Sequence, residues 1–475
     1  MEKKKIHYGW YIVIGCLLIT CTMVPPIMAL SNKFLIQVTE ELGLSRSGFT
    51  LANTILQGLG IFISPMVSSR LAKGDMRKIQ CISIIGFALS YASYSLAQNA
   101  IHLYISSVFI GVFWLNSALI PVSMMITNWF AKKRGLAMSI AMAGIGVGGT
   151  IFSPIVTMLL EKYGWRHTYQ IMALIVLVIA LPAAFFILRK RPEDMGLKPY
   201  GSDEADTKTA DKSSDKKESD LSIEVQQCWP KFFFWLMLIG MLCNGLINSG
   251  SLGQFPPAIE EMHGPAIQAA IISIYSMVGI FGKIVLGWLN DRFGVVVSTV
   301  CGCVAFAVSF IFMLMGSNVT MLYIMAVLFG LGDAIGTVTP PLVTAAVFGT
   351  KKYGQAYGIA NSFTQVGLTC GSLMVAAIYD GTGAYTSAWI LLFILTIVTL
   401  VGWIGSYYLS RKYVENPFSL KQRDCFFSET VPDIILIILS EFFLLIYFLL
   451  HFPCQFVQIP YHIHHCHSLM NGSHG

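Results

Sequence analysis

The chain has 475 residues, of which 55% are hydrophobic and only 12% are charged. Soluble domains carry about 25% charged residues, so this composition excludes an ordinary soluble enzyme or binding domain and indicates a protein embedded in a lipid bilayer. The formal net charge of +6 does not indicate nucleic-acid binding, because the basic residues gather at the ends of apolar stretches, as they do in membrane proteins.

Stretches of about 20 apolar residues, the length that crosses ~30 Å of hydrocarbon, recur along the chain. They predict an all-α membrane protein with twelve transmembrane helices in two six-helix pseudo-repeats. The first six helices are expected near 9–31, 47–69, 79–98, 102–128, 136–160 and 167–188, and the second six near 231–255, 266–289, 295–316, 319–346, 353–379 and 385–410.

A long polar segment, residues 189–230, separates the two sets of helices and is predicted to be a flexible cytoplasmic linker. It divides the chain into an N-terminal bundle, residues 1–188, and a C-terminal bundle, residues 231–412. An atypical tail follows at 413–475. Its apolar run 433–453 is a candidate for an extra hydrophobic helix, and its His-rich end has no assigned role.

The 31 Lys and Arg residues are unequally distributed between the two ends of the predicted helices. Four of them fall on the side opposite the linker: Lys33, Arg46, Lys162 and Arg166. Because basic residues collect in cytoplasmic loops, we expect a multi-pass plasma-membrane protein with a cytoplasmic N-terminus. The first apolar stretch lacks a small-residue cleavage site, so no signal peptide is expected.

The two predicted bundles resemble each other in sequence at an offset of 219 residues. The segment 132–137 opens the fifth predicted helix, and the similar segment 351–356 opens the eleventh. Parallel duplication of this kind occurs in transporters that bind their substrate between the two halves.

Pairs of glycines four residues apart occur on the fifth and eleventh predicted helices. These pairs are Gly144 with Gly148 and Gly367 with Gly371. Small residues at this spacing let helix backbones approach closely, either in static packing or in a contact that slides during a conformational change.

Lys283 and Asp333 are the only charged residues well inside the predicted helices. A charge at bilayer depth costs at least ~2.5–3.5 kcal/mol and usually marks a pathway or a site. Lys283 precedes Asp291 by eight residues and lies ~12 Å from the cytoplasmic surface, whereas Asp333 lies ~27 Å from Lys351. This difference of ~15 Å predicts separate roles rather than a direct salt bridge.

Lys283 either binds an anion in a central cavity or is a structural cation whose stem reaches toward water. Burial disfavours a charged carboxylate, so Asp333 is either a proton carrier or a polar contact within the bundle. Polar residues of the seventh and eleventh predicted helices are expected to orient a substrate; these are Asn244, Asn248, Asn361 and Gln365. The sequence shows no catalytic residue, nucleotide-binding motif, metal cluster or cofactor site.

The segment Gly287-Trp288-Leu289-Asn290-Asp291-Arg292-Phe293-Gly294 resembles the G-x-L-x-D-R-x-G loop motif of the major facilitator superfamily. The resemblance implies that Gly287, Asp291, Arg292 and Gly294 form a gating loop. The corresponding first-half loop, residues 69–78, keeps basic residues but lacks the D-R-x-G core, so its gate contacts are expected to differ.

Three further motifs resemble the oxalate/formate antiporter and monocarboxylate transporter branch of that family over residues 6–412. They are His7-Tyr8-Gly9-Trp10, the run from Arg134 through Gly144, Gly146, Gly148 and Gly149 to Pro154, and Gly164-Trp165-Arg166, together with Arg191-Pro192-Glu193-Asp194-Met195-Gly196 after the sixth predicted helix. In the resembling anion transporters, a basic residue of the eighth span contacts the substrate carboxylate, a place that Lys283 takes here. The second cation that the oxalate antiporter has on the eleventh span is absent from 353–379.

The resemblance and the single buried cation together predict a secondary active transporter of an organic anion, a monocarboxylate, working by alternating access as an antiporter or a proton symporter. The expected partners are the small organic anion, the lipid bilayer and, in a symporter, protons, and we expect a functional monomer. Two alternatives are a carrier of larger amphipathic anions, such as bile-acid-like compounds, and a non-transporting membrane sensor. An enzyme and a nucleic-acid-binding protein are not expected.

Overall fold

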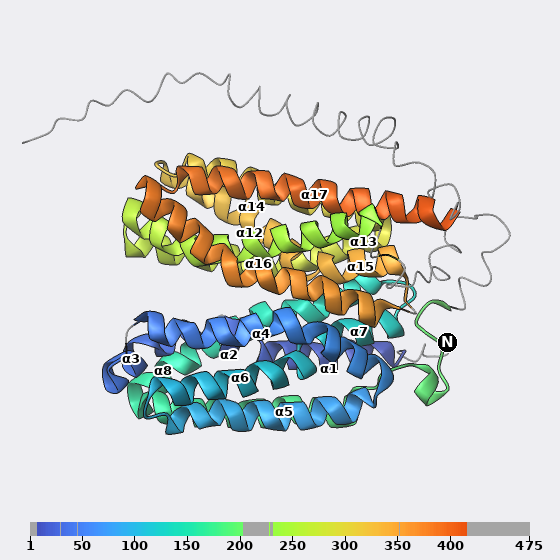
Figure 1. The fold of residues 1–475 in the computed structure, drawn as a ribbon, viewed down its shortest axis with the longest axis horizontal. Helices are drawn as coiled ribbons and strands as arrows, with labels where there is room; N and C mark the ends of the chain where they lie inside the picture. The colour runs from blue at the N-terminus through green and yellow to red at the C-terminus, as the bar shows by residue number, and fades with distance from the viewer. Residues whose placement is uncertain are drawn as a thin grey trace, which may run out of the picture. The chain divides into compact units, whose positions relative to one another are not determined.

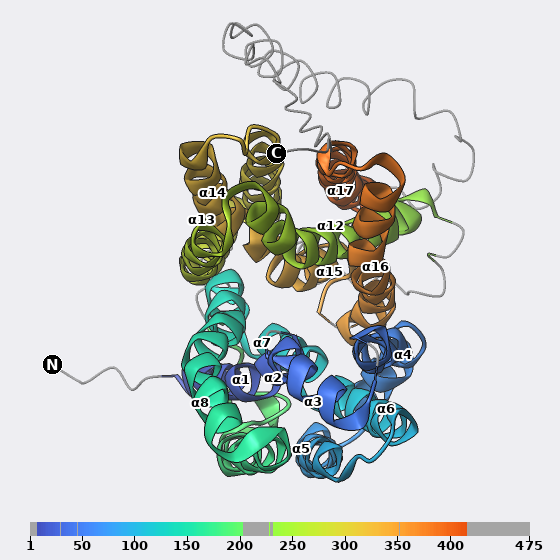
Figure 2. The same cartoon turned by 90° about the vertical axis from the view of Figure 1, so that its left-hand side faces the viewer.

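The apolar stretches fold as α-helices, which confirms the predicted all-α membrane fold. The computed structural model describes residues 7–28, 30–44, 46–202, 228, 231–350 and 352–415. These residues belong to one compact unit, residues 1–417. Within it, α1 to α8 gather in one bundle and α12 to α17 in another (Figures 1 and 2). The apolar run predicted at 433–453 and nearly all of the acidic and basic part of the linker lie outside the described residues.

The first bundle is built from eight α-helices. They are α1 (Gly9–Met23), α2 (Pro25–Met28), α3 (Leu35–Leu42), α4 (Arg46–Lys73), α5 (Met76–Ser93), α6 (Ala100–Ser117), α7 (Leu119–Trp129) and α8 (Arg134–Pro182). Short helical turns join or follow them: η1 (Ser31–Phe34), η2 (Tyr94–Leu96), η3 (Ala183–Ile187) and η4 (Glu193–Met195).

The second bundle is built from six α-helices. They are α12 (Phe232–His263), α13 (Pro265–Leu314), α14 (Val319–Thr337), α15 (Thr339–Phe348), α16 (Tyr353–Thr382) and α17 (Thr386–Glu415). The α14–α15 break at Val338 comes just before Pro340-Pro341, where missing backbone N–H groups interrupt a continuous helix.

Ten helical segments among the described residues are long and apolar enough to cross a membrane, and two of them are double. A straight helix as long as α8, with 49 residues, would extend ~73 Å, more than twice the hydrocarbon thickness. Gly164 (φ 72°, ψ 173°) interrupts α8, and Gly294 (φ 88°, ψ 171°) interrupts α13. Counting each as two helices gives the twelve segments that the sequence predicts.

Side-chain caps define where several helices begin. Asp75 accepts a hydrogen bond from the backbone N–H of Lys78 at the start of α5, and Asn99 accepts one from His102 at the start of α6. Asn318 caps α14 in the same way through Thr320. These caps satisfy backbone N–H groups that have no partner within the helix, so the short loops between spans are set by local sequence.

The predicted glycine pairs lie where two helices of one bundle touch backbone to backbone. A Cβ on Gly144 would lie 2.6 Å from the carbonyl oxygen of Leu17 in α1, and one on Gly148 would overlap that of Cys21. In the second bundle, Gly367 and Gly371 of α16 meet the carbonyls of Leu242 and Leu246 in α12 in the same manner. The two repeats therefore use the same device at equivalent helix pairs.

We predict that Gly148→Ala destabilises the first bundle, because the added methyl group must displace the α1 backbone. Overpacking of this kind costs about 1–3 kcal/mol. The matched control is Gly58→Ala in α4, where nothing lies within 4 Å of the added Cβ. In a thermal-unfolding assay of detergent-solubilised protein, Gly148→Ala should lower Tm by several degrees, whereas Gly58→Ala should leave Tm unchanged or raise it. Equal Tm values for the two variants would contradict the close contact.

Candidate functional site

The backbones of α13 and α14 touch at two glycines. A Cβ on Gly282 would lie 2.8 Å from the carbonyl oxygen of Gly330, and one on Gly330 would lie 2.7 Å from that of Tyr275. Lys283 follows the first glycine directly, and Asp333 lies one helical turn beyond the second. The contact therefore brings the two charged residues of the membrane interior to the same level.

Lys283 and Asp333 form an ion pair, with 3.5 Å between Lys283 Nζ and Asp333 Oδ2. The Lys283 side chain is 8% exposed and that of Asp333 21% exposed. The predicted difference in depth between them is wrong. The prediction assumed one continuous helix between Asp333 and Lys351. In the structure, α14 ends at Thr337 and a separate helix, α15, begins at Thr339. The Lys stem, which leans toward the N-terminus of its helix, spans the remaining distance.

A cluster of aromatic rings lies one helical turn before Asp333 in α14. Tyr275 is buried in α13 and meets Phe329 of α14 edge-on at 5.2 Å between centroids. Phe329 also packs against Phe255 of α12 and Phe306 of α13. Such an apolar surrounding lowers the local dielectric constant and strengthens the attraction between the two charges.

Asn248 of α12 lies against the same stretch of α14, and Asn244 lies one turn earlier in α12. Asn248 Nδ2 donates to the backbone oxygen of Asn244 at 2.8 Å and to its side-chain oxygen at 3.1 Å. A Cβ on Gly336, one turn beyond Asp333, would overlap the Asn248 amide. Asn244 Nδ2 is buried and has no hydrogen-bond partner, so one donor is available beside Asn248.

Asn361 and Gln365 lie at the contact between the two bundles. Asn361 Nδ2 donates to Ser64 Oγ of α4 at 2.9 Å. A Cβ on Gly60, one turn earlier in α4, would lie 2.8 Å from Gln365 Cγ, and the Gln365 Oε1 atom is buried without a partner. The structure thus places these two predicted substrate ligands on the α4–α16 contact, where Asn361 bonds to the other bundle.

Asp291 joins the second bundle to the first. Its Oδ1 accepts a hydrogen bond from the N–H of Gly135 at 2.6 Å, and its Oδ2 accepts one from Leu136 at 2.7 Å. Both donors belong to the first turn of α8, where free N–H groups and the helix dipole favour a negative charge. We call these two hydrogen bonds the Asp291 latch.

The other residues of the predicted gating loop have distinct positions. Gly287 lies against the backbone of Gly135, where any side chain would overlap it. Gly294 has the positive φ that reverses the chain between the two halves of α13. Arg292 lies over the rings of Trp288 and Phe293, 5.5 and 5.6 Å from their centroids, so it packs on its own segment.

The corresponding loop of the first bundle is held differently. Asp75 caps its own helix instead of crossing to the other bundle. Lys190, after α8, donates to the carbonyls of Ala72 at 2.6 Å and Gly74 at 2.9 Å. Partial burial lowers the pKa of Lys190.

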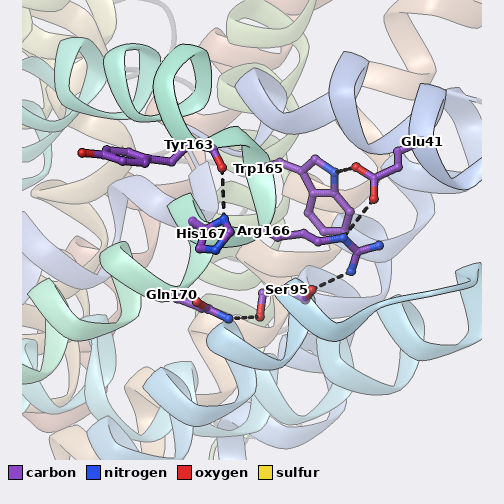
Figure 3. A network of polar contacts seen from close by, with 7 residues as sticks. All are labelled: Glu41, Ser95, Tyr163, Trp165, Arg166, His167 and Gln170. Carbon is purple, nitrogen blue, oxygen red and sulfur yellow. Dashed lines mark hydrogen bonds and ion pairs between the residues drawn. The ribbon is translucent and has the colours of Figure 1, made fainter.

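A polar network that the sequence did not predict holds α3 against α8 at the end of the bundle away from Asp291. Glu41 accepts hydrogen bonds from Trp165 Nε1 at 2.6 Å and Arg166 Nε at 2.9 Å, and Arg166 Nη1 reaches the carbonyl of Ser95 at 2.6 Å (Figure 3). The sequence shows the Gly164-Trp165-Arg166 motif but does not show that Glu41 is its acidic partner. The four-residue spacing of Lys33, Gln37 and Glu41 is the sequence signal for a common face.

Lys33 and Gln37 also contact one stretch of α8. Lys33 Nζ donates to Thr157 Oγ1 at 2.8 Å, and Gln37 Nε2 donates to the carbonyl of Leu160 at 3.3 Å. Within the described residues, no group of three His, Cys, Asp or Glu side chains is placed to hold a metal ion.

A duplicated helical bundle in a membrane, with an ion pair between its helices and hydrogen bonds between its halves, is typical of transport proteins. The chain belongs to the Major Facilitator Superfamily, whose sequence pattern matches residues 10–272 and 237–466. It therefore moves small solutes across a membrane and is not an enzyme. The predicted resemblance to this family and its monocarboxylate transporter branch is confirmed.

Two relatives illustrate the range of similarity. Monocarboxylate transporter 12 of Rattus norvegicus is 24% identical over 88% of this chain and 89% of its own length. The glycerol-3-phosphate transporter of Bacillus subtilis is 27% identical over 55% of this chain and 60% of its own. Among solved structures, the transporter FucP in the outward conformation has a TM-score of 0.60 at 14% identity, covering 83% of this chain and 99% of that one, which shows a shared fold.

We predict that the Glu41 network stabilises the protein only above acidic pH. Hydrogen bonds from Trp165 and Arg166 lower the pKa of Glu41 from its ordinary 4.5. A lowered pKa in the folded state gives stability that is present above the ordinary pKa and is lost as the pH falls through the lowered value. In thermal unfolding at a series of pH values, Glu41→Gln should have a lower Tm than wild type at pH 7, and this difference should shrink below pH 4.5.

The neighbouring exposed residue Glu40 supplies the matched control for this measurement. Glu40→Gln should leave Tm unchanged at pH 7. Equal effects of the two substitutions, or a difference for Glu41→Gln that persists at acidic pH, would show that the network contributes no charge-dependent stability.

Proposed function

We propose that the protein carries a small organic monocarboxylate across the plasma membrane by alternating access, as an antiporter or a proton symporter. The observation that carries the proposal is the buried Lys283–Asp333 ion pair. One cation at this depth matches one carboxylate, and the same cation already holds a carboxylate, that of Asp333. The similarity to monocarboxylate transporter 12 supports the same class of substrate.

In the proposed binding step, the substrate carboxylate takes the place of Asp333 beside Lys283. A lysine ammonium has three donors, so it can keep a hydrogen bond to a neighbour while it receives the anion. The unpaired donor Asn244 Nδ2 and the Asn248 amide, on the α12 side of α14, are proposed to orient the rest of the substrate. Gln365 Oε1, at the α4–α16 contact, is a further polar group proposed to face the substrate path.

Displacing Asp333 from Lys283 leaves a carboxylate without its cation in an apolar surrounding. Removing one partner of a buried pair is costly, about 3–5 kcal/mol. Protonation of Asp333 removes the unpaired charge, so the anion and the proton favour each other's binding in a symporter. In an antiporter, a second anion replaces the first at Lys283. The Lys283–Asp333 ion pair forms again after the first anion leaves and before the second one binds.

The contacts between the bundles support a state that is closed toward the cytoplasm. With the N-terminus in the cytoplasm, the Asp291 latch lies at that surface, and the Ser64–Asn361 hydrogen bond lies in the cytoplasmic half of α4. Alternating access then requires that these contacts separate. The close backbone contacts at the glycine pairs, between α1 and α8 and between α12 and α16, remain intact while the two bundles rock against each other.

We predict that saturable uptake of a monocarboxylate depends on the cation at position 283. Lys283→Met/Asp333→Asn removes both charges and avoids an unpaired buried carboxylate, so it should fold with a Tm near that of wild type. Its uptake in proteoliposomes, measured with a panel of labelled carboxylates, should fall at least tenfold, in line with the loss of about 1.5–3 kcal/mol for a charged hydrogen bond.

Lys283→Arg is the matched control, because it keeps a cation at the same place and should retain measurable uptake. Wild-type uptake by the neutral double variant would show that the ion pair is structural and would sink the proposed binding role. Transport of larger amphipathic anions alone, with no uptake of small monocarboxylates, would favour the alternative substrate class.

We predict that Asp333 decides between the two coupling modes. In a symporter, a pH gradient drives uptake by wild type, and Asp333→Asn abolishes this gradient-driven accumulation while it preserves exchange of external for internal anion. In an antiporter, wild-type uptake requires internal anion and ignores the pH gradient. Gradient-driven accumulation by Asp333→Asn equal to that of wild type would exclude Asp333 as the proton carrier.

A further inference from the structure

The first residues of the linker are fastened to the first bundle. We call residues 198–201 the strap. Tyr200 N–H donates to the carbonyl of Trp129 at 2.8 Å, and the carbonyl of Tyr200 accepts from the N–H groups of Ala131 and Lys132 at 3.1 and 3.0 Å. A single residue of the strap thus fixes both sides of the turn that follows α7.

Side chains hold the strap in the same place. The Tyr200 ring meets those of His7 and Trp10 edge-on, with centroids 5.4 and 5.9 Å away. His7 Nε2 also lies 3.1 Å from the carbonyl of Lys198. Gly201 has a φ of +85°, and a Cβ on it would lie 2.6 Å from Lys132 Cβ. The strap therefore lies directly against the Lys132 side chain.

The turn that the strap fixes leads directly into the Asp291 latch. Lys133, the next residue, has φ 57° and ψ 29°, and among the described residues it alone has a positive φ without being glycine. A lysine rarely adopts this left-handed conformation, which costs energy that contacts with the surrounding structure must offset. The conformation starts α8 at Arg134 and points the N–H groups of Gly135 and Leu136 at the Asp291 carboxylate.

We propose that the strap positions the Asp291 latch and thereby controls opening toward the cytoplasm. By fixing Ala131 and Lys132, Tyr200 keeps Lys133 in its left-handed conformation and keeps the two N–H donors aimed at Asp291. Detachment of the strap lets the turn relax and weakens the latch. This inference rests on the proposed function, in which breaking the latch opens the cytoplasmic side.

The test measures the separation of the bundles without any substrate. Spin labels are placed at Lys78 and Val297, which are both exposed and lie 219 residues apart at equivalent places of the repeat. The full chain, with its native cysteines replaced and its uptake retained, is reconstituted in nanodiscs. The distribution of distances between the two spin labels is measured by double electron–electron resonance spectroscopy. The variants compared are Tyr200→Ala, Tyr200→Phe, Asp291→Asn and the double variant Tyr200→Ala/Asp291→Asn.

The proposal expects Asp291→Asn to raise the population with long distances, and Tyr200→Ala to raise it at least threefold. Tyr200→Phe keeps the ring contacts and should match wild type. The double variant should match Asp291→Asn, because two changes that act through one latch are not additive. Gly201→Ala, which keeps the ring but pushes on Lys132, should shift the population in the same direction as Tyr200→Ala.

Two results would overturn the proposal while leaving the proposed function in place. One is a distance distribution unchanged by both Tyr200→Ala and Gly201→Ala although Asp291→Asn shifts it. The other is full additivity in the double variant, which would mean that the strap acts independently of the latch. If Asp291→Asn itself changes nothing, the latch is not a gate, and both the inference and the gating part of the proposed function are wrong.

Discussion

The contact between the backbones of α13 and α14 is the constraint on which the buried site depends. Gly282 and Gly330 allow these helices to touch without side chains between them, and Lys283 and Asp333 meet because of it. Two charges taken out of water persist only when they are paired and enclosed together. Tyr275 and Phe329 add an apolar aromatic contact between the same two helices, and a less polar surrounding strengthens the attraction between two charges.

The two repeats share their internal packing but differ at the loop where the bundles meet. Gly148 in α8 and Gly367 in α16 lie directly against the backbone of an equivalent helix, so the two bundles share this close contact. Asp291 reaches across to the other bundle, whereas Asp75 caps its own helix and Lys190 fastens the loop beside it. One side of the contact therefore carries a charged latch, and the other uses the neutral Ser64–Asn361 hydrogen bond. Hydrogen bonds of these kinds contribute about 0.5–3 kcal/mol each, a range that thermal motion and ligand binding can overcome.

Composition and hydropathy determined that this is an all-α membrane protein, because a span in lipid must be long, apolar and helical to satisfy its backbone. The sequence similarity at an offset of 219 residues indicated the duplicated bundles. The glycine spacings likewise predicted close helix contacts, since residues four apart share a helix face. Lys283 and Asp333 stood out for the same reason, as charges in apolar surroundings. The sequence did not predict that they pair, because the depth of Asp333 depends on the break at Val338 and on the meeting of Gly282 with Gly330.

Contacts between residues far apart in the chain were decided only by the tertiary structure. Glu41 accepts hydrogen bonds from Trp165 and Arg166, and Asp291 accepts them from the first turn of α8. Tyr200 forms backbone hydrogen bonds with the turn that precedes α8. The local sequence shows that such residues are polar, charged or aromatic. It does not show how the helices are arranged in space, and this arrangement determines which residues become their partners. Periodicity along one helix fixes which face a side chain occupies, whereas the packing of several helices fixes what that face meets.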